Sequence, residues 1–425
     1  MAVTNITVPA GGAATVGNND TNVYGLGNAT VAAGNGTDAF QILGSARLAI
    51  GSGVNTINIL GNGTVSGSLS TSSSTSRNAA PVVAPGGANQ ISIGGIGAVT
   101  LGGGANSIRL GSGSVSVGNG ANLIIASGSG SVAVGTGANS VRIGGSGTVS
   151  GSTASTVGNA INIGGPGRVT LGGGSDTVSM SSGTASVGNG NNFVSVAGSA
   201  SVVAGSGNDT ISTGAGTISA GAGNDVITMS GSGSINAGTG SDSISLGAGS
   251  NTVAAAGTAT VTSAAGTSAS IAAGSLQVIN NAAGQTDKVL SGSVTILGGS
   301  GAVRFIGGGS GTTASLRGGM GADTFVGGAG RTTMVAGSGS SLFEFFKSTQ
   351  AGAFGAGAGG NHTIMGFSTV SGSLYIEGFT LAQLQALKAI KVVGGNTVIT
   401  LADKTSITLV GVTSLNAGNI ITTPI

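Results

Sequence analysis

Residues 204–246 read AGSGNDTISTGAGTISAGAGNDVITMSGSGSINAGTGSDSISL, and this stretch decides the fold. An acidic residue follows a pair of glycines at Asp209, Asp225 and Asp242, at intervals of 16 and 17 residues. Apolar residues stand two and four positions after Asp225 and Asp242, a spacing that places both side chains on one face of a strand. A shorter glycine unit with its own apolar residue lies between. Each interval therefore reads turn, short strand, turn, short strand.

The same unit recurs from residue 22 to residue 242, and most of its intervals are 16 or 17 residues. One interval of 34 contains a degenerate repeat with a Ser/Thr run at 66–76, and one of 20 carries extra residues near Ser152. A single repeat cannot bury its apolar face, so the repeats must stack. The period predicts an all-β fold, a parallel β-solenoid with two short strands per coil of 16–17 residues. An Asn or Asp (Asx) marks each coil at Asn22, Asp38, Asn55, Asn89, Asn106, Asn122, Asn139, Asn159, Asp176, Asn192, Asp209, Asp225 and Asp242.

The composition supports this interpretation and excludes several other classes. Glycine accounts for 88 of 425 residues, whereas proline accounts for only 5, which excludes collagen. Apolar residues make up 39% and charged residues 6%, the opposite of a disordered chain. The absence of cysteine excludes a disulfide framework and thiolate metal sites. Periodic glycines are expected at the corners of the coils, where positive φ angles are needed.

The chain offers little catalytic chemistry. It has one histidine, His362, and none of the motifs GxSxG, HExxH or GxxxxGK[ST]. Repeat-bearing enzymes place a catalytic domain before the repeats, and repeats that begin by residue 20 leave no room for one. We therefore predict that the protein is not an enzyme and that His362 is structural. Scattered basic residues and a net charge of +2 predict no nucleic-acid partner, and no apolar run reaches the roughly 18 residues of a membrane span.

The repeats resemble the repeats-in-toxin (RTX) β-roll, whose nonapeptide is GGxGxDxUx, where U is apolar. The best matches are AGSGNDTIS (204–212), AGAGNDVIT (220–228), AGTGSDSIS (237–245) and GGMGADTFV (318–326). In that family, turn carbonyls and Asp carboxylates of adjacent coils bind Ca²⁺, a hard cation that prefers oxygen ligands. The resemblance implies a few calcium sites, and the residues it assigns to them are Asp209, Asp225, Asp242, Gly205, Gly207, Gly221, Gly223, Gly238, Gly240 and Asp323.

Two departures from the family pattern weaken the calcium prediction. The coil is 16–17 residues long, shorter than the usual roll, and one of its two turns lacks the Asp. Eight of the thirteen Asx positions are Asn, a weaker calcium ligand than a carboxylate. Stacked amides instead favour a hydrogen-bonded ladder. The alternative that the Asx residues only cap turns also stays open. The predicted structural ladder comprises Asn89, Asn106, Asn122, Asn139, Asn159 and Asn192.

Composition changes along the chain and suggests four regions. They are a solenoid of 16–17-residue coils at 1–253, degenerate Ala/Ser/Gly-rich coils at 254–297, a nonapeptide-type β-roll at 298–346, and a C-terminal cap at 347–425. Within the cap we expect a short helix at about 381–391, started by a Thr380–Gln383 capping box, with Leu381, Leu384, Leu387 and Ile390 along one side. NTVITLADKTSITLVGV, which follows, predicts a β-hairpin. A helix and a hairpin would cover the open end of a solenoid.

The segment 361–380 resembles the region that follows RTX repeats in type I secretion substrates. The N-terminus lacks a basic n-region and an apolar h-region, and the first basic residue is Arg47, so a cleaved signal peptide is not expected. The resemblance implies an uncleaved C-terminal export signal, recognition by a type I secretion apparatus, and a secreted protein that is extracellular or at the cell surface.

These observations favour a structural protein that self-assembles outside the cell as an S-layer, a filament or a biofilm matrix component. Its principal partner would be another copy of itself. In TNITVPAG (4–11), polar and apolar residues alternate from the start and no helical cap is seen. This predicts an open strand edge for joining another subunit. The alternatives are a calcium-binding extracellular adhesin, with the 66–76 run as a contact site, and an ice-binding module. Ice binders need a regular Thr array, whereas the outward positions here mix Ser, Thr, Asn, Ala and Arg.

Overall fold

The computed structural model describes residues 3–51, 53–67, 88–264, 267–280, 285–346 and 359–423. The Ser/Thr run at 66–76 lies almost entirely outside these residues. The chain forms two compact units, Met1–Thr210 and Ile211–Ile425. We call them unit 1 and unit 2 and describe each by itself.

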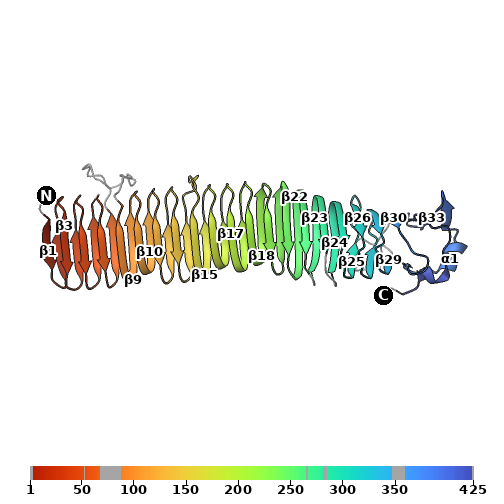
Figure 1. Ribbon diagram of the computed structural model, residues 1–425, viewed down its shortest axis with the longest axis horizontal. Coiled ribbons are helices and arrows are strands. Elements are labelled where there is room, and N and C mark those ends of the chain that lie inside the picture. Colours follow the sequence, from red (N-terminus) through yellow and green to blue (C-terminus); the bar gives the residue numbers. More distant parts are fainter. Residues whose placement is uncertain are drawn as a thin grey trace. The chain divides into compact units, whose positions relative to one another are not determined.

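The fold is a parallel β-solenoid of about 18 turns with a spacing of about 17 residues, which confirms the predicted fold class. In unit 1, β1 (Thr4–Val8) pairs in parallel with β3 (Thr21–Gly25), and β2 (Gly12–Thr15) pairs with β4 (Ala29–Ala32). Strands of one coil thus pair with their equivalents one coil later, and Figure 1 shows this stacking from β1 to β17. The remaining strands of unit 1 are β5 (Ala39–Ile42), β6 (Ala46–Ile50), β7 (Thr56–Ile59), β8 (Gly63–Gly67), β9 (Gln90–Leu101), β10 (Ser107–Val117), β11 (Leu123–Ala126), β12 (Gly130–Ala133), β13 (Ser140–Ile143), β14 (Gly147–Ser150), β15 (Ala160–Thr170), β16 (Thr177–Ser186) and β17 (Phe193–Val203).

Unit 2 continues with the same kind of pairing and ends in a small cap. Its parallel strands are β18 (Thr210–Ala222), which starts at the last residue of unit 1, β19 (Val226–Met229), β20 (Gly233–Thr239), β21 (Ser241–Leu246), β22 (Gly249–Ser263), β23 (Thr267–Asn280), β24 (Gln285–Gly298), β25 (Val303–Ile306), β26 (Thr313–Arg317), β27 (Asp323–Val326), β28 (Arg331–Val335), β29 (Ser341–Phe345), β30 (Asn361–Met365), β31 (Ser373–Ile376) and β35 (Ile420–Ile421). The cap contains α1 (Leu381–Ala386), β32 (Ile390–Val393), β33 (Asn396–Thr400), β34 (Ser406–Leu409) and a 3₁₀ turn, η1 (Ala417–Asn419).

The core is a thin layer of aliphatic side chains that point inward from every second residue. In β7, Ile57 and Ile59 are buried while Thr56 and Asn58 are exposed. Ile57 stacks in register on Ile91 of β9 and Ile59 on Ile93. Period-two alternation therefore fixes which face is buried.

Glycine makes close stacking of the coils possible at the corners. A Cβ atom at Gly44 would lie 2.5 Å from the carbonyl carbon of Gly27 in the preceding coil, a distance that real side chains do not tolerate. Gly120 has a φ of +127°, in a region that side-chain-bearing residues rarely adopt. These two constraints explain why glycine recurs with the coil.

Aromatic residues form a stack inside the C-terminal coils of unit 2. Phe305, Phe325 and Phe343 occupy one register position in β25, β27 and β29. Successive ring centroids lie 4.9 Å apart, which matches the spacing of paired strands. The concentration of phenylalanine after residue 300 is thus a property of this part of the core.

The cap agrees with the sequence in its elements and differs in their lengths. The Thr380 side chain accepts from the Gln383 N–H at 3.2 Å, and Gln383 Oε1 accepts from the Thr380 N–H at 2.8 Å, as a capping box requires. The helix ends at Ala386, since Lys388 already has a φ of 53°. The prediction of a helix to residue 391 was wrong, because residues 390–393 form β32 instead, antiparallel to β33. The predicted apolar side of the helix is also absent: Leu384 is buried, but Leu387 is 65% exposed. The predicted hairpin is β33 with β34.

Candidate functional site

The first candidate site is a column of buried Asx side chains, one from each coil, at the start of the strand that follows the glycine turn. The Asx residues of the column, from Asp38 to Asp209 in unit 1 and Asp225 and Asp242 in unit 2, are each at most 7% exposed. The predicted first member, Asn22, is not part of the column. It lies in register with Ala39, and the residue in the column is Thr21, whose N–H donates to Asp38 Oδ1 at 3.0 Å.

Asn122 shows how an amide satisfies this position. Its Oδ1 accepts from the backbone N–H of Asn106 at 3.1 Å and from the side-chain amide of Asn106 at 2.9 Å. Its own Nδ2 donates to the carbonyls of Gly118 and Gly120, at 3.4 and 3.0 Å, and to Asn139 Oδ1 in the next coil at 2.9 Å. The Asn side chain therefore ties its own turn together and links two neighbouring coils.

The same pattern extends through unit 1. Side-chain amides donate to the next Asx oxygen from Asn55 to Asn89, Asn89 to Asn106, Asn106 to Asn122, Asn122 to Asn139, Asn139 to Asn159, Asn159 to Asp176 and Asn192 to Asp209. Each amide is both donor and acceptor, which is the property that a continuous ladder needs. This series of hydrogen bonds includes all six predicted ladder residues: Asn89, Asn106, Asn122, Asn139, Asn159 and Asn192.

An Asp in the column creates a different situation. Asp176 Oδ1 accepts from the N–H and the side-chain amide of Asn159, at 2.7 and 3.0 Å, and its N–H donates to Asn192 Oδ1. Asp176 Oδ2 is buried and makes no hydrogen bond among the described residues, and the same holds for Oδ2 of Asp38 and Asp242. In the amide version of the site, the second atom is a donor that faces turn carbonyls. A carboxylate oxygen at that position needs a proton or a cation to face them.

Burial raises the pKa of several of these carboxyl groups. Loss of solvation raises the pKa of Asp176 above its usual range, and the hydrogen bonds from Asn159 only partly oppose this. Burial likewise raises the pKa of Asp38 and of Asp242, with a further rise at Asp242 from the charge of Asp225. These aspartates are therefore suited to hold a proton or to bind a cation that neutralises their charge.

The residues assigned to calcium occupy equivalent places around the column. Each Asp follows a glycine pair four and two positions earlier, and the equivalent carbonyls before Asn122 are those of Gly118 and Gly120, which accept its amide. In unit 2, Asp225 and Asp242 come together: the Asp225 N–H donates to Asp242 Oδ1 at 3.0 Å. In unit 1, Asp209 Oδ1 accepts from the N–H and the side-chain amide of Asn192, both at 2.8 Å. The six glycines are Gly205, Gly207, Gly221, Gly223, Gly238 and Gly240.

Asp323 differs from the other calcium candidates. Its Oδ1 accepts from the Val303 N–H at 3.0 Å and its Oδ2 from the Gly319 N–H at 2.9 Å. Both carboxylate oxygens are thus used by the backbone in a turn-capping arrangement. Across the described ranges of the chain, no three side chains of the types His, Cys, Asp and Glu gather into one group.

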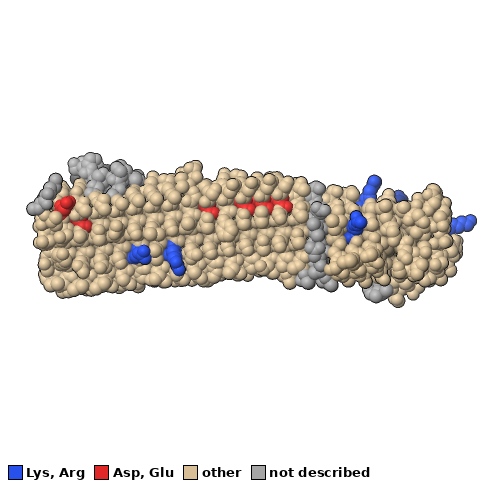
Figure 2. Space-filling view, in the orientation of Figure 1, with Lys and Arg blue, Asp and Glu red and all other residues tan. Residues whose placement is uncertain are grey.

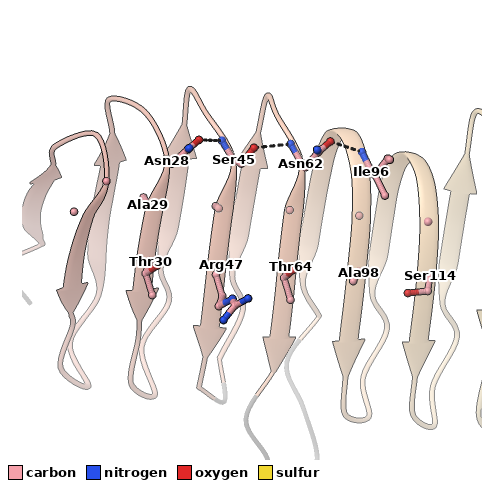
Figure 3. Close-up of a pocket in the computed structure, with 16 residues that line it drawn as sticks. Asn28, Ala29, Thr30, Ser45, Arg47, Asn62, Thr64, Ile96, Ala98 and Ser114 are labelled. Carbon is pink, nitrogen blue, oxygen red and sulfur yellow. Dashed lines mark hydrogen bonds between the residues drawn. The ribbon is translucent and has the colours of Figure 1, made fainter.

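The second candidate site is a groove on the surface of unit 1, with a volume of about 730 Å³ (Figure 3). Its floor is a column of small inward-facing residues, Gly12, Ala29, Ala46, Gly63, Gly97 and Gly113. A Cβ atom at Gly63 would lie 2.9 Å from Cδ1 of Ile59 and 3.0 Å from Cδ1 of Ile93. The absence of a side chain at Gly63 therefore lets the backbone pack closely against these core residues.

The two walls of the groove are outward-facing side chains. On one wall Asn28 Oδ1 accepts from the Ser45 N–H at 3.0 Å, Ser45 Oγ from the Asn62 N–H at 3.3 Å, and Asn62 Oδ1 from the Ile96 N–H at 2.9 Å (Figure 3). The opposite wall carries Thr30, Arg47, Thr64, Ala98 and Ser114. A second hollow further along unit 1, of about 340 Å³, has the same register and includes Gly130, Gly147, Gly167 and Arg168.

The sequence predicted the ladder positions but not the groove. The signal that would have revealed the groove is the recurrence of Gly or Ala at one inward position of the second strand. On the face drawn in Figure 2, few side chains are charged.

Comparison with models of known protein families, and with curated protein sequences, finds no match to this chain. The RTX resemblance therefore remains a prediction from motifs. Among the described residues, no helix has both the length and the apolar character needed to cross a bilayer.

Proposed function

We propose that this protein is a secreted, non-enzymatic structural protein that self-associates on or outside the cell, in an S-layer, a filament or an extracellular matrix. The observation that carries the proposal is the open edge of the first described coil. Among the described strands, β1 pairs only with β3, and β2 only with β4. Unpaired strand edges are templates for pairing with another chain.

The free hydrogen-bonding groups of β1 follow from its pairing. The Thr4 N–H donates to the Asp20 carbonyl, and the Val8 carbonyl accepts from the Leu26 N–H, so even-numbered residues face β3. Alternate residues of a parallel strand face opposite neighbours. The backbone groups of Asn5 and Thr7 therefore point away from β3 and are available to a second copy.

The surface chemistry supports the same function. The net charge is only +2 over 425 residues, so copies of this chain repel one another weakly. The proposal also includes export by a type I secretion apparatus. Only the family resemblance of the repeats and of segment 361–380 supports this part of it.

Substitution at Thr7 tests the proposal. Thr7→Pro removes the N–H from the open edge without removing a hydrogen bond to β3, and Thr7→Val is the matched control, since it keeps the N–H. We expect wild type and Thr7→Val to form large assemblies in electron micrographs and in light scattering, and Thr7→Pro to form fewer or shorter ones. The proposal would be contradicted if the wild-type protein stayed monomeric at all concentrations, pH values and calcium levels.

A calcium-dependent adhesin is the second candidate, and the buried Asp225–Asp242 pair favours it. Calcium-dependent adhesion would disappear with a chelator, whereas assembly through the β1 edge would persist. No observation favours ice binding: one outward column reads Asn58, Ser92, Arg109, Ile125 and Arg142, without a regular Thr array.

A further inference from the structure

Three leucines form an exposed ridge on unit 1, one coil apart. Leu26, Leu43 and Leu60 follow β3, β5 and β7 and are 61%, 54% and 58% exposed. Their N–H groups donate to Val8, Gly25 and Ile42 of the preceding coils, so the three side chains stand in one column. Leu60 is followed in the column by Gly94, which ends the ridge. We call Leu26, Leu43 and Leu60 the leucine ridge.

The ridge lies directly beside the groove described above. One glycine, Gly27, Gly44 or Gly61, separates each leucine from the wall residue Asn28, Ser45 or Asn62. The ridge and the groove therefore run side by side through the same coils, and both repeat at the strand spacing of about 4.8 Å. Ile96, which ends the wall in Figure 3, is 63% exposed and extends the apolar surface.

We propose that this surface binds a second copy of the chain, with the leucine ridge of each copy lying in the groove of the other. A two-fold interface is self-complementary, because the same surface patch of both copies forms it. A ridge and a groove of equal period, side by side on one molecule, meet this requirement when two copies face each other in parallel, with the two-fold axis along the ridge. The inference rests on the proposed self-association and adds a lateral contact to the end contact at β1.

Area and charge are compatible with such a pair. The leucine ridge with Ile96 exposes on the order of 400 Å² of apolar surface per copy, within the range of the largest patches on monomeric proteins, which are often functional. Adding the groove walls brings two copies to roughly the 1,000 Å² that a specific interface needs. The residues that line the groove include one charged side chain, Arg47, and no carboxylate, so no buried like-charge pair opposes the contact.

The main test compares the ridge with an equal number of exposed apolar residues elsewhere in unit 1. The ridge variant is Leu26→Ser/Leu43→Ser/Leu60→Ser, and the control is Leu123→Ser/Val157→Ser/Val203→Ser, at positions that are 39%, 46% and 48% exposed. All of these side chains are exposed, so neither variant should unfold. In sedimentation velocity we expect the ridge variant to weaken lateral association at least tenfold, and the control to behave as wild type.

A second variant tests the groove independently of the ridge. Thr64→Trp places a bulky side chain in the groove and leaves all three leucines in place, and we expect the same loss of lateral pairing. If Thr64→Trp pairs normally while the ridge variant does not, the ridge contacts something other than the groove and the proposal is overturned. It is also overturned if wild type shows no lateral pairing but cosediments with phosphatidylcholine vesicles through the leucines.

The end contact and the lateral contact can fail separately. Thr7→Pro should remove end-to-end growth and retain side-by-side dimers, and the ridge variant should do the reverse. Long single filaments from the ridge variant that match those of wild type in width would refute the lateral contact and leave the proposed function standing. Monomers from every variant and from wild type would refute both.

Discussion

The side-chain amide of Asn122 donates to Oδ1 of Asn139 in the next coil at 2.9 Å, while Oδ1 of Asn122 receives two hydrogen bonds from Asn106. Both residues are 2% exposed. A buried polar group is stabilising only when it is fully hydrogen-bonded, and here every atom of the amide has a partner. The column is therefore an internal seam that holds successive coils in register.

Substitution of Asn122 by Ala should be costly. It removes the acceptor of the buried Asn106 N–H and one of the two acceptors of the Asn106 amide, which keeps its hydrogen bond to Gly104. It also removes the donor to the partly buried carbonyls of Gly118 and Gly120. Each such group costs about 1 to 3 kcal/mol, so we expect a loss of about 3 kcal/mol in the free energy of unfolding, measured with urea. The control Ser131→Ala, at an exposed position of β12, should change it by less than about 0.5 kcal/mol. Equal effects would show that the seam does not stabilise the fold.

Asp176→Asn should stabilise the protein at neutral pH. The amide supplies the donor that the ionised carboxylate lacks, and it removes the penalty of a buried charge. A raised pKa in the folded state means that the folded protein binds the proton more tightly than the unfolded chain does. Wild-type stability should therefore rise as pH falls through the folded pKa of Asp176 toward 3.8, and this rise should be smaller in Asp176→Asn. Urea unfolding of both proteins between pH 4 and 8 measures the difference, and identical pH profiles would contradict the prediction.

Calcium should act at neighbouring aspartates rather than at isolated ones. Asp225 and Asp242 are consecutive in the column of unit 2, so two carboxylates and several turn carbonyls are near each other. At a free calcium concentration of 100 times Kd, binding to the folded state adds about 2.7 kcal/mol. We expect calcium to raise the Tm of wild type and of Asp176→Asn, and to have no effect on Asp225→Asn/Asp242→Asn. A calcium effect that survives the double substitution would place the metal elsewhere.

His362 should make the C-terminal coils of unit 2 sensitive to acid. Its ring is buried, neither nitrogen makes a well-formed hydrogen bond among the described residues, and burial lowers its pKa to about 4 against the partial opposition of Gly328 and Asp403. The unfolded chain takes up the proton near pH 6.5 and the folded chain only near pH 4, so stability is lost as pH falls through this window. The loss should reach about 3 kcal/mol. His362→Leu should abolish it, whereas Asn361→Leu, at an exposed neighbour, should keep it. Unfolding followed by circular dichroism at pH 7 and pH 4.5 distinguishes the two.

The sequence was sufficient to predict those features that repeat with the coil. Period-two alternation and the glycine pairs led to a parallel solenoid, and the recurring Asx led to the ladder residues from Asn89 to Asn192. The start of the column was misplaced by one residue, because Thr21 and Asn22 are both polar and the glycine motif is loose there. Only the register with Asp38 decides between them.

Features that depend on three-dimensional shape were beyond the sequence pattern. The helix was predicted too long because Leu381, Leu384, Leu387 and Ile390 have helical spacing, although tertiary contacts place Ile390 in a strand. The groove depends on how closely the backbone at Gly63 packs against Ile59 and Ile93, and the recurrence of Gly or Ala at that inward position was not recognised as its signal. The leucine ridge was visible as a recurrence every 17 residues, but its exposure was not.

An ion pair between a buried carboxylate and a partly exposed arginine in unit 2 gives the last prediction. Arg304 donates to Glu344 Oε2 at 2.7 Å, and the Glu344 side chain is 1% exposed, while that of Arg304 is 38% exposed. Burial raises the pKa of Glu344, and the charge and hydrogen bond of Arg304 oppose that rise.

Removing only the arginine should therefore leave a buried carboxylate without its partner, a change that typically costs about 3 to 5 kcal/mol. Arg304→Met should lower the free energy of unfolding by about that amount at pH 7, and less at pH 5, where the carboxyl group is more readily protonated. Arg304→Met/Glu344→Gln should recover most of the loss, because the charge is then gone, and Arg331→Met, at an exposed arginine of β28, should have little effect. If the single and double variants were equally unstable, the cost would arise from packing of the arginine stem rather than from the stranded charge.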